Sequence, residues 1–340
     1  MMTAVIDPAT WCIVVNPAGG AGRAARLRPT LVAALDRGGV PYTCAESGAP
    51  GDVQRIAARA AESGCRRLLA VGGDGTLNEL VNGLLQSGVP LGDCLVAAAA
   101  GGTGNDWSRS MEVPDDAGRL AACMARARSR RTDLGMAEDG RGRRAAFHNV
   151  AGAGLDAEVL GRMPRRGPRA AAHLLGLLRT LRDYRAPHFD VVADGLRTRG
   201  ASLLVLACIG PRCGGGMRLT PGAVVDDGWL DLLLVDPLTL PGALARLPKL
   251  FDGRLEADPA FHVRHCRAAT IAADPPCGVE LDGQLSGTTP VTVTILPGAL
   301  NALDCRPATR EVAGQRFSGI APGSCRAWSR PDTAARRARR

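Results

Sequence analysis

The sequence contains almost no lysine. Lysine and arginine together number 42 in the 340 residues, but Lys249 is the only lysine. A P-loop needs a Gly-Lys-Ser/Thr segment, and a protein kinase needs a lysine on a strand beside its phosphates. Both of these large nucleotide-binding classes are therefore excluded. If the protein binds phosphate, it does so without a lysine clamp.

The sequence also lacks paired cysteine motifs and long apolar runs. Its 11 cysteines include no Cys-x-x-Cys pair, which is typical of reduced cysteines in a cytosolic protein. The first ten residues have no basic residue before an apolar run, so we expect no signal peptide. No apolar run approaches the roughly 18 to 20 residues of a transmembrane helix. We therefore expect a cytoplasmic protein with no transmembrane segment.

Acidic residues are scarce at the end of the chain. Residues 306–340 hold nine arginines but only Glu311 and Asp332 as acids, so most of the net charge of +9 lies there. The remaining chain is close to neutral, and we expect no nucleic-acid groove. Few apolar residues occur in this last segment, which predicts an Arg-rich flexible tail over residues 306–340.

Residues 11–135 alternate short β-rich runs with helical stretches rich in Ala, Leu and Arg. Strand, Gly-rich turn and helix in repetition is typical of a parallel sheet with helices on both faces, and ligands bind at the carboxyl ends of its strands. We assign residues 1–136 to an α/β domain. The expected strands are 11–15, 40–44, 67–71 and 95–99, and the expected helices are 24–37, 52–63 and 77–86.

The later part of the chain has short β-rich runs separated by Gly, Pro and Asp-Gly signals. This pattern is typical of a mostly antiparallel β domain, which we assign to residues 137–305, with the boundary in the polar stretch 136–144. One helix is expected, at 169–182. The expected strands are 189–192, 203–209, 229–235, 269–272 and 291–296.

Three Gly-rich turns follow three of the predicted strands, and each ends where a helix begins. Glycine lets the backbone approach a ligand with its N–H groups turned inward, and the following helix adds its positive end. Three such turns at one edge of a sheet would form a polyphosphate cradle made of backbone. These glycine turns are residues 16–22 (Asn-Pro-Ala-Gly-Gly-Ala-Gly), 72–76 (Gly-Gly-Asp-Gly-Thr) and 101–106 (Gly-Gly-Thr-Gly-Asn-Asp).

Aspartates within the glycine turns distinguish two kinds of nucleotide site. The first turn alone also fits a dinucleotide fingerprint, with Glu46 at the spacing of a ribose contact. A dehydrogenase keeps carboxylates away from its pyrophosphate, because like charges repel. A phosphoryl-transfer enzyme uses them to hold Mg²⁺, and Asp74, Asp106 and Asp133 meet that demand. Asp74 has a second interpretation as the N-cap of a helix that opens at Thr76.

Residues 72–84, Gly-Gly-Asp-Gly-Thr-Leu-Asn-Glu-Leu-Val-Asn-Gly-Leu, resemble the signature of the diacylglycerol kinase catalytic-domain family, which includes soluble bacterial lipid kinases and sphingosine kinases. The resemblance covers about residues 11–304. It implies an ATP-dependent kinase that phosphorylates a lipid hydroxyl, with the lipid held by the β-rich domain. Blocks similar to the family's others occur in the same order at 16–20, 102–109, 149–157, 214–231 and 282–283.

The resemblance also implies which residues bind ATP and Mg²⁺. Asp74, Asp106 and Asp133 would form a network of carboxylates and water around Mg²⁺. Asp227 would lie at a separate structural Mg²⁺ site. The expected ATP contacts are Asn16, Pro17, Ala18, Gly19, Gly20, Thr43, Gly72, Gly73, Asp74, Gly75, Thr76, Glu79, Gly102, Thr103, Gly104 and Asn105.

The general base is expected near residue 282. A lipid hydroxyl is a weak nucleophile, so a carboxylate should accept its proton. The family has Asp-Gly-Glu in this region, whereas this chain has Asp282-Gly283-Gln284, and Gln cannot accept a proton at neutral pH. We predict that Asp282 is the base and that Gln284 orients the hydroxyl. Glu280, on the same strand face, is a substitute; a weakened enzyme and a plain Asp-Gly turn without chemistry also stay open.

An enzyme with a lipid substrate acts at a membrane surface, and we expect this one to act at the inner face of the membrane. Arginines at 162, 165, 166 and 169 precede the predicted helix at 169–182, and together with the tail they would attract anionic lipid. The alternative is a helix packed on the β domain with solvated arginines. Two other functions stay open: a kinase for a soluble acceptor, as in the NAD kinases that share a Gly-Gly-Asp-Gly turn, and a nucleotide-binding protein without catalysis.

Overall fold

The first sheet begins with four parallel strands. The computed structural model describes residues 7–162, 180, 183–255 and 257–307. Three of the four strands are buried on both faces, as expected for the near-continuous apolar runs of a parallel sheet, whereas the edge strand 42–46 is partly exposed. They are β1 (Trp11–Val15), β2 (Tyr42–Glu46), β3 (Arg67–Gly72) and β4 (Leu95–Ala100), in the order β2-β1-β3-β4.

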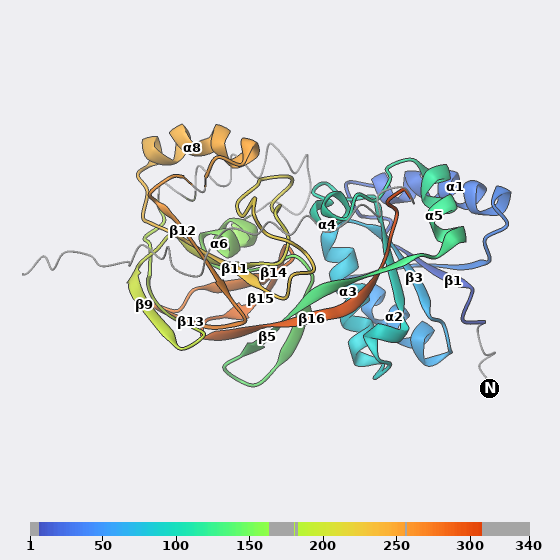
Figure 1. Ribbon diagram of the computed structural model, residues 1–340, viewed down its shortest axis with the longest axis horizontal. Coiled ribbons are helices and arrows are strands. Elements are labelled where there is room, and N and C mark those ends of the chain that lie inside the picture. Colours follow the sequence, from blue (N-terminus) through green and yellow to red (C-terminus); the bar gives the residue numbers. More distant parts are fainter. Residues whose placement is uncertain (1–6, 163–179, 181–182, 256, 308–340) are drawn as a thin grey trace, which may run out of the picture. The chain divides into compact units, whose positions relative to one another are not determined.

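Helices cover both faces of these strands (Figure 1). Successive residues of β1 point to opposite sides, so Ile13 packs in the cluster of α1 and α5 and Val14 in the cluster of α2 and α3. The predicted α/β half of the fold is therefore confirmed. The helices are α1 (Arg23–Arg37), α2 (Asp52–Glu62), α3 (Asp74–Gln86) and α5 (Ala117–Arg126), with a short α4 (Asp106–Ser110) after β4.

Two long strands extend this sheet beyond its parallel part. The end of β16 (Val291–Leu303) pairs in parallel with β4, while β5 (Ser129–Asp139) runs antiparallel along β16. Only residues 291–296 were predicted as strand, because Pro297 and Gly298 are turn signals. The structure accommodates them in a register shift between Leu296 and Leu300. The sheet continues through β13 (Ala268–Asp274), β8 (His188–Ala193) and β9 (Leu196–Ala201), and β6 (Arg144–Phe147) pairs with β5.

The second sheet is antiparallel throughout. This confirms the predicted β-rich architecture of the later part of the chain. The domain boundary near residue 136 stays a prediction, since the first sheet takes strands from both sides of it. The order is β12 (Phe261–Cys266), β11 (Leu230–Val235), β10 (Leu204–Cys208), β7 (Val150–Gly154), β14 (Gly278–Leu281) and β15 (Gln284–Thr288).

The later part of the chain contains more helix than the single one predicted. The structure adds α6 (Leu155–Arg162) directly after β7, and α8 (Leu240–Asp252). The start of α8 has a signal that we missed, since Thr239 Oγ1 accepts a hydrogen bond from Gly242 N–H (3.3 Å). The predicted helix at 169–182 lies outside the described residues apart from Thr180, and so do residues 308–340 of the predicted tail. No helix in the described ranges is long and apolar enough to span a membrane.

Candidate active site

The three glycine turns lie against one another at the carboxyl ends of β1, β3 and β4. Gly20 (φ 57°) leaves no room for a side chain against the carbonyl oxygen of Gly101. A Cβ on Gly73 would lie 3.1 Å from the Cα of Gly102. These contacts join backbone to backbone, so packing of the turns already requires glycine before any ligand is considered. The structure therefore brings the three turns together.

Hydrogen bonds fix the glycine turns. Asn16 Nδ2 donates to Thr76 Oγ1 (3.2 Å), which joins the first turn to the second. In the third turn the left-handed Asn105 (φ 54°) accepts the N–H of Gly102 (2.8 Å) and donates back to its carbonyl (3.0 Å). The Gly102 amide is thus used within its own turn, so fewer amides than expected point at a ligand.

Amides for an anion remain at the start of α3. The helix begins at Asp74 without a capping side chain among the described residues, and the N–H groups of Thr76 and Leu77 return to the carbonyl of Gly73. The N–H groups of Asp74 and Gly75 therefore belong to the open first turn of the helix. The positive end of a helix dipole at such a turn favours a phosphate group.

Asp74 caps a different helix from the one expected. Its Oδ2 accepts from the N–H of Asp106 (3.1 Å) and its Oδ1 from the N–H of Trp107 (3.0 Å), both in the first turn of α4. The interpretation of Asp74 as the N-cap of a helix opening at Thr76 is wrong, because α3 already begins at Asp74 itself. Asp74 instead fixes α4, and with it Asp106, beside the second turn.

One carboxylate oxygen of Asp106 lacks a hydrogen-bond partner among the described residues. Its Oδ2 accepts from Gly215 N–H (2.8 Å), whereas its Oδ1 is buried without a hydrogen-bond partner in the described ranges, 3.8 Å from Arg109 Nη1. Burial raises the pKa of Asp106, and the charge of Asp74 raises it further. A Cβ on Gly104 would lie 3.0 Å from Asp74 Oδ2 and 3.2 Å from Asp106 Oδ2. Such an arrangement fits Mg²⁺, which takes one or two carboxylates and several waters.

Asp133 makes its hydrogen bonds with two backbone amides. Its Oδ1 accepts from Gly298 N–H and its Oδ2 from Gly228 N–H, both at 2.7 Å. Its neighbour is Asp227, whose pKa is raised by burial and also by the charge of Asp133. Within the residues that the structure describes, no group of three or more acidic, His or Cys side chains could hold a metal. A network that joins Asp133 to Asp74 and Asp106 through water stays a prediction, as does a Mg²⁺ site at Asp227.

The other residues expected to contact ATP lie around the glycine turns. Their own hydrogen bonds show no role in binding a ligand. Thr103 is exposed in the third turn, and Thr43 is exposed on β2 beside β1. Glu79 Oε2 accepts from Gly51 N–H (3.2 Å) at the start of α2, so part of its role is to cap that helix. Their contacts with ATP stay predictions. The same holds for Pro17, Ala18, Gly19 and Gly72.

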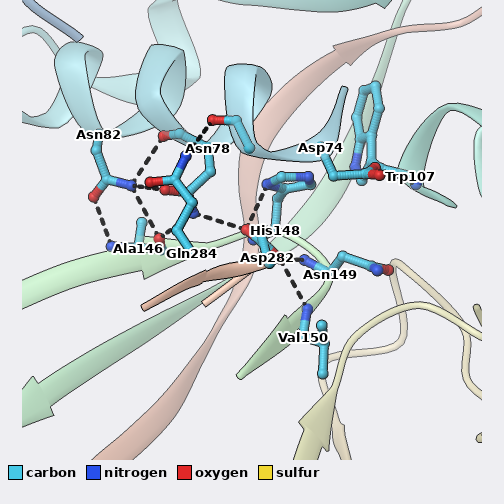
Figure 2. A network of polar contacts seen from close by, with 12 residues as sticks. Asp74, Asn78, Asn82, Trp107, Ala146, His148, Asn149, Val150, Asp282 and Gln284 are labelled. Atoms are coloured by element: carbon cyan, nitrogen blue, oxygen red, sulfur yellow. Dashed lines mark hydrogen bonds and ion pairs between the residues drawn. The ribbon is translucent and has the colours of Figure 1, made fainter. Parts of the chain in front are cut away.

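A buried network connects α3 with the hairpin between β14 and β15 (Figure 2). Asp282 Oδ1 accepts from the N–H groups of Asn149 (3.0 Å) and Val150 (2.9 Å). Its Oδ2 accepts from Asn78 Nδ2 (2.8 Å) and from His148 N (2.9 Å), and His148 Nδ1 lies 2.7 Å away. Burial alone would raise the pKa of Asp282, but His148 and the amides outweigh it, so the pKa lies below its usual value. We call these residues the Asp282 network.

Gln284 touches the second glycine turn. Its Nε2 donates to the carbonyl of Gly75 (2.7 Å), and a Cβ on Gly75 would lie 2.9 Å from that nitrogen. Asp282, two residues earlier, is bonded to Asn78 one turn further along α3. Both predicted catalytic residues therefore contact the helix that follows the second turn.

Glu280 does not share a face with Asp282. Its Oε2 accepts from Gly283 N–H (2.6 Å), and its buried side chain interacts with Asp156 of α6. Burial raises the pKa of Asp156 to about 6 and that of Glu280 well above its usual value, and the charge of Asp156 raises the pKa of Glu280 further. Strand alternation ends at Leu281 because Asp282 adopts a left-handed conformation (φ 49°). The interpretation of Glu280 as a substitute base is wrong.

Sequence reasoning missed three polar residues of this region. Asn78 Nδ2 also donates to Ala146 O (2.9 Å), and Asn82 both accepts from Ala146 N–H (2.8 Å) and donates to its carbonyl (3.0 Å). Asn78 and Asn82 are four residues apart, so they share a helix face, and this spacing was a usable signal. His148 gave no signal beyond its place next to Asn149.

Two families match the chain in sequence order. The diacylglycerol kinase catalytic domain matches residues 10–137. The YegS C-terminal NAD kinase beta sandwich-like domain matches residues 149–304. The first match contains all three glycine turns, and the second contains Asp282 and His148's neighbour Asn149. The two matches together contain the candidate site apart from Ala146 and His148, which lie between them.

Relatives and solved structures agree with these matches. A diacylglycerol kinase of Mycobacterium tuberculosis is 29% identical over 296 residues, which are 85% of this chain and 93% of that protein. A probable YegS-like lipid kinase of Pseudomonas fluorescens is 32% identical over 256 residues, or 74% of this chain and 81% of that protein. The crystal structure of a diacylglycerol kinase from Bacillus anthracis has a TM-score of 0.70 at 24% identity, with 89% of this chain and 98% of that chain covered. The last similarity concerns the fold.

Proposed function

Because this chain belongs to the diacylglycerol kinase catalytic-domain family and is a kinase, we propose that it transfers the γ-phosphoryl group of ATP to a hydroxyl group of diacylglycerol or a similar lipid. One observation carries the proposal. The three glycine turns touch one another, carboxylates lie at their edge, and Gln284 reaches across from the second sheet to Gly75. Donor-side and acceptor-side elements therefore meet at one place.

The triphosphate would bind where the glycine turns meet the start of α3. The N–H groups of Asp74 and Gly75 stand in the open first turn of that helix, and the turns bear no side chains where they touch. Backbone amides and a helix dipole can hold phosphate without any lysine. This agrees with a chain whose single lysine, Lys249, lies on α8.

Asp106 is the residue that would hold Mg²⁺. Its Oδ1 has no hydrogen-bond partner among the described residues, and Asp74 keeps it in place by capping α4. Bound there, the ion would neutralise charge on the transferred phosphoryl group. The chain's own residues carry out the remaining steps of the transfer. They orient the phosphates, exclude water and receive the proton of the acceptor hydroxyl.

The acceptor would approach from the side of the hairpin between β14 and β15. Gln284 bridges this hairpin and the second turn, so a hydroxyl beside its amide group would lie next to the phosphate site. We propose that the acceptor is a lipid taken at a membrane surface, which is supported by the similarity to a diacylglycerol kinase and a probable lipid kinase.

The test is a radiolabelled phosphoryl-transfer assay with the full chain. The protein is given γ-labelled ATP, with and without Mg²⁺, and mixed micelles of diacylglycerol or of other hydroxyl lipids, with NAD as the soluble acceptor. We expect label in a lipid product only when Mg²⁺ is present. Label in NADP would support a soluble-acceptor kinase, and tight ATP binding without any labelled product would support a nucleotide-binding protein.

A matched pair of variants connects this activity with the site. Asp106→Asn should raise the Mg²⁺ concentration for half-maximal rate at least about tenfold, because a neutral amide is a weaker ligand than a carboxylate. Asp115→Asn, at an exposed position before α5, should leave it unchanged. Equal Mg²⁺ dependence of the two variants would contradict the assignment of Asp106 but not the lipid kinase function.

A further inference from the structure

The hydrogen-bonding positions of the Asp282 carboxylate are all occupied, so Asp282 does not act as a base by itself. Its carboxylate accepts hydrogen bonds from Asn149 N, Val150 N, Asn78 Nδ2 and His148 N, and a fifth group, His148 Nδ1, lies 2.7 Å away. A carboxylate offers about four lone-pair directions. None is left for a substrate hydroxyl. Asp282 therefore acts through a neighbour or serves only as a structural tie.

His148 is the neighbour that could act. Its ring is buried, meets Trp107 edge-on with ring centroids 6.0 Å apart, and presents Nδ1 to Asp282. Neither ring nitrogen has a hydrogen-bond partner in the described part of the chain, but Nδ1 lies 2.7 Å from the Asp282 carboxylate, whereas Nε2 has no such ion-pair contact there. A buried polar atom left unpaired destabilises the folded state. Such an atom needs an explanation, and a tie to Asp282 alone does not provide one.

The surroundings of His148 suit an imidazolium ion. The carboxylate of Asp282, from the hairpin after β14, lies against the ring (Figure 2). Asp74, at the start of α3, acts on the ring through its charge, while Trp107 of α4 and Asn78 of α3 are uncharged. Burial lowers the pKa of His148, but the charge and hydrogen bond of Asp282 and the charge of Asp74 outweigh it, so the pKa lies above its usual value.

We infer that His148 Nε2 accepts the proton of the acceptor hydroxyl and that Asp282 orients the imidazole, which rests on the proposed lipid kinase function. The hydroxyl O–H bond breaks and an N–H bond forms at Nε2. The oxygen forms a bond to the γ-phosphorus, and the bond from that phosphorus to the bridging oxygen breaks, so ADP leaves with the electron pair. The imidazolium stays beside Asp282 and Asp74 until its proton passes to solvent. An aspartate that fixes a histidine base is an arrangement known from hydrolases.

The decisive variant is His148→Asn. Asn places a side-chain N–H near the position of Nδ1 and nothing at the position of Nε2, so the bond to Asp282 can persist while the base is lost. We expect kcat to fall about 10²- to 10⁴-fold, with the KM for ATP within about twofold of wild type. His188→Asn, at an exposed position of β8, is the matched control and should behave as wild type. A folded His148→Asn enzyme with kcat within about threefold of wild type overturns the inference.

A rescue experiment separates a base from a structural tie. In His148→Gly, added imidazole should restore kcat in proportion to its free-base concentration, and a folded variant without rescue contradicts the role of Nε2. Should these variants not fold, the wild-type pH profile decides. A histidine base places the acid limb of kcat above about pH 6.5, whereas a limb only below about pH 5 identifies a carboxylate and overturns the inference. Wild-type protein that labels no lipid contradicts the proposed function itself, before any variant is compared.

Discussion

The glycine turns and the Asp282 network both attach to α3, but they are held together differently. The turns meet mainly backbone to backbone, as Gly73 and Gly102 do, with the carboxylates of Asp74 and Asp106 at their edge. The network consists of one buried carboxylate and its donors, and its bond from Asn78 to Asp282 joins residues 204 positions apart. Shape therefore holds the donor side of the site, and buried electrostatics holds the acceptor side.

This difference determines how each region tolerates change. A side chain added to the turns meets backbone atoms that cannot move aside, so the damage is steric and local. A group removed from the network leaves a buried charge or its donors without partners, which affects every element that the carboxylate joins. We expect the network to carry the larger share of stability and the turns to carry the larger share of nucleotide affinity.

Asp282→Asn tests the network and should have the largest effect on stability. An amide nitrogen in place of Oδ2 would face three donors, from Asn78 and His148, and the buried charge that they stabilise would be gone. We expect the free energy of unfolding to fall by about 3 to 5 kcal/mol, measured by urea denaturation at pH 7.

The matched control for this change is Asp190→Asn. Asp190 is partly exposed and pairs with the exposed Arg197 and Arg199, and surface pairs of this kind contribute little to stability. If the two variants lost equal stability, the contrast between buried network and surface pair would be wrong. Because Asp282 has a lowered pKa, the difference between them should shrink as the pH falls below about 3.8.

Gly102→Ala tests the turns and should have an intermediate effect on stability. The new Cβ would overlap the backbone of Gly73 and approach Asn105 Oδ1 at 2.8 Å. We expect a loss of about 1 to 3 kcal/mol and a rise of at least about tenfold in the Kd for ATP, measured by calorimetry. Gly140→Ala is the control, since its Cβ would meet only Pro290 at an ordinary 3.5 Å. Unchanged ATP binding in Gly102→Ala would show that the contact of the turns does not shape the phosphate site.

The same contrast explains how much of the molecule the sequence could predict. The turns carry their signal locally, because glycine marks each close approach and each turn stands between a strand and a helix. The parallel strands were readable for the same reason. The hydrogen bonds of Asp133 were not, since they depend on β5 lying along β16, where Gly298 donates to Asp133.

The sequence revealed less of the Asp282 network than of the glycine turns. The Asp-Gly pair after β14 was visible as a hairpin signal, but the five donors on its carboxylate come from other elements. The role of His148 depends on a ring nitrogen that only tertiary packing leaves unpaired. Strand alternation also misplaced Glu280, because the left-handed conformation of Asp282 rotates its side chain out of the pattern.

Gln284→Glu sharpens the comparison, because Gln284 is the residue of the hairpin that donates to the second turn. A glutamate cannot donate to the carbonyl of Gly75, so we expect a loss of about 0.5 to 1.5 kcal/mol of stability. Gln54→Glu removes a comparable amide bond to Gln86 at the exposed surface and should cost less. The added charge beside the phosphate turn should also raise the KM for ATP.

The effect of Gln284→Glu on turnover decides where the proton goes. Were the base a carboxylate of this hairpin, a second one at position 284 would raise kcat, as the Asp-Gly-Glu pattern of the family suggests. With His148 Nε2 as the acceptor, the new carboxylate has no proton to take, and kcat should stay at or below the wild-type value. A severalfold gain in kcat would indicate that the base is a carboxylate of the hairpin. His148 would then have only a structural role beside Asp282 and Asp74.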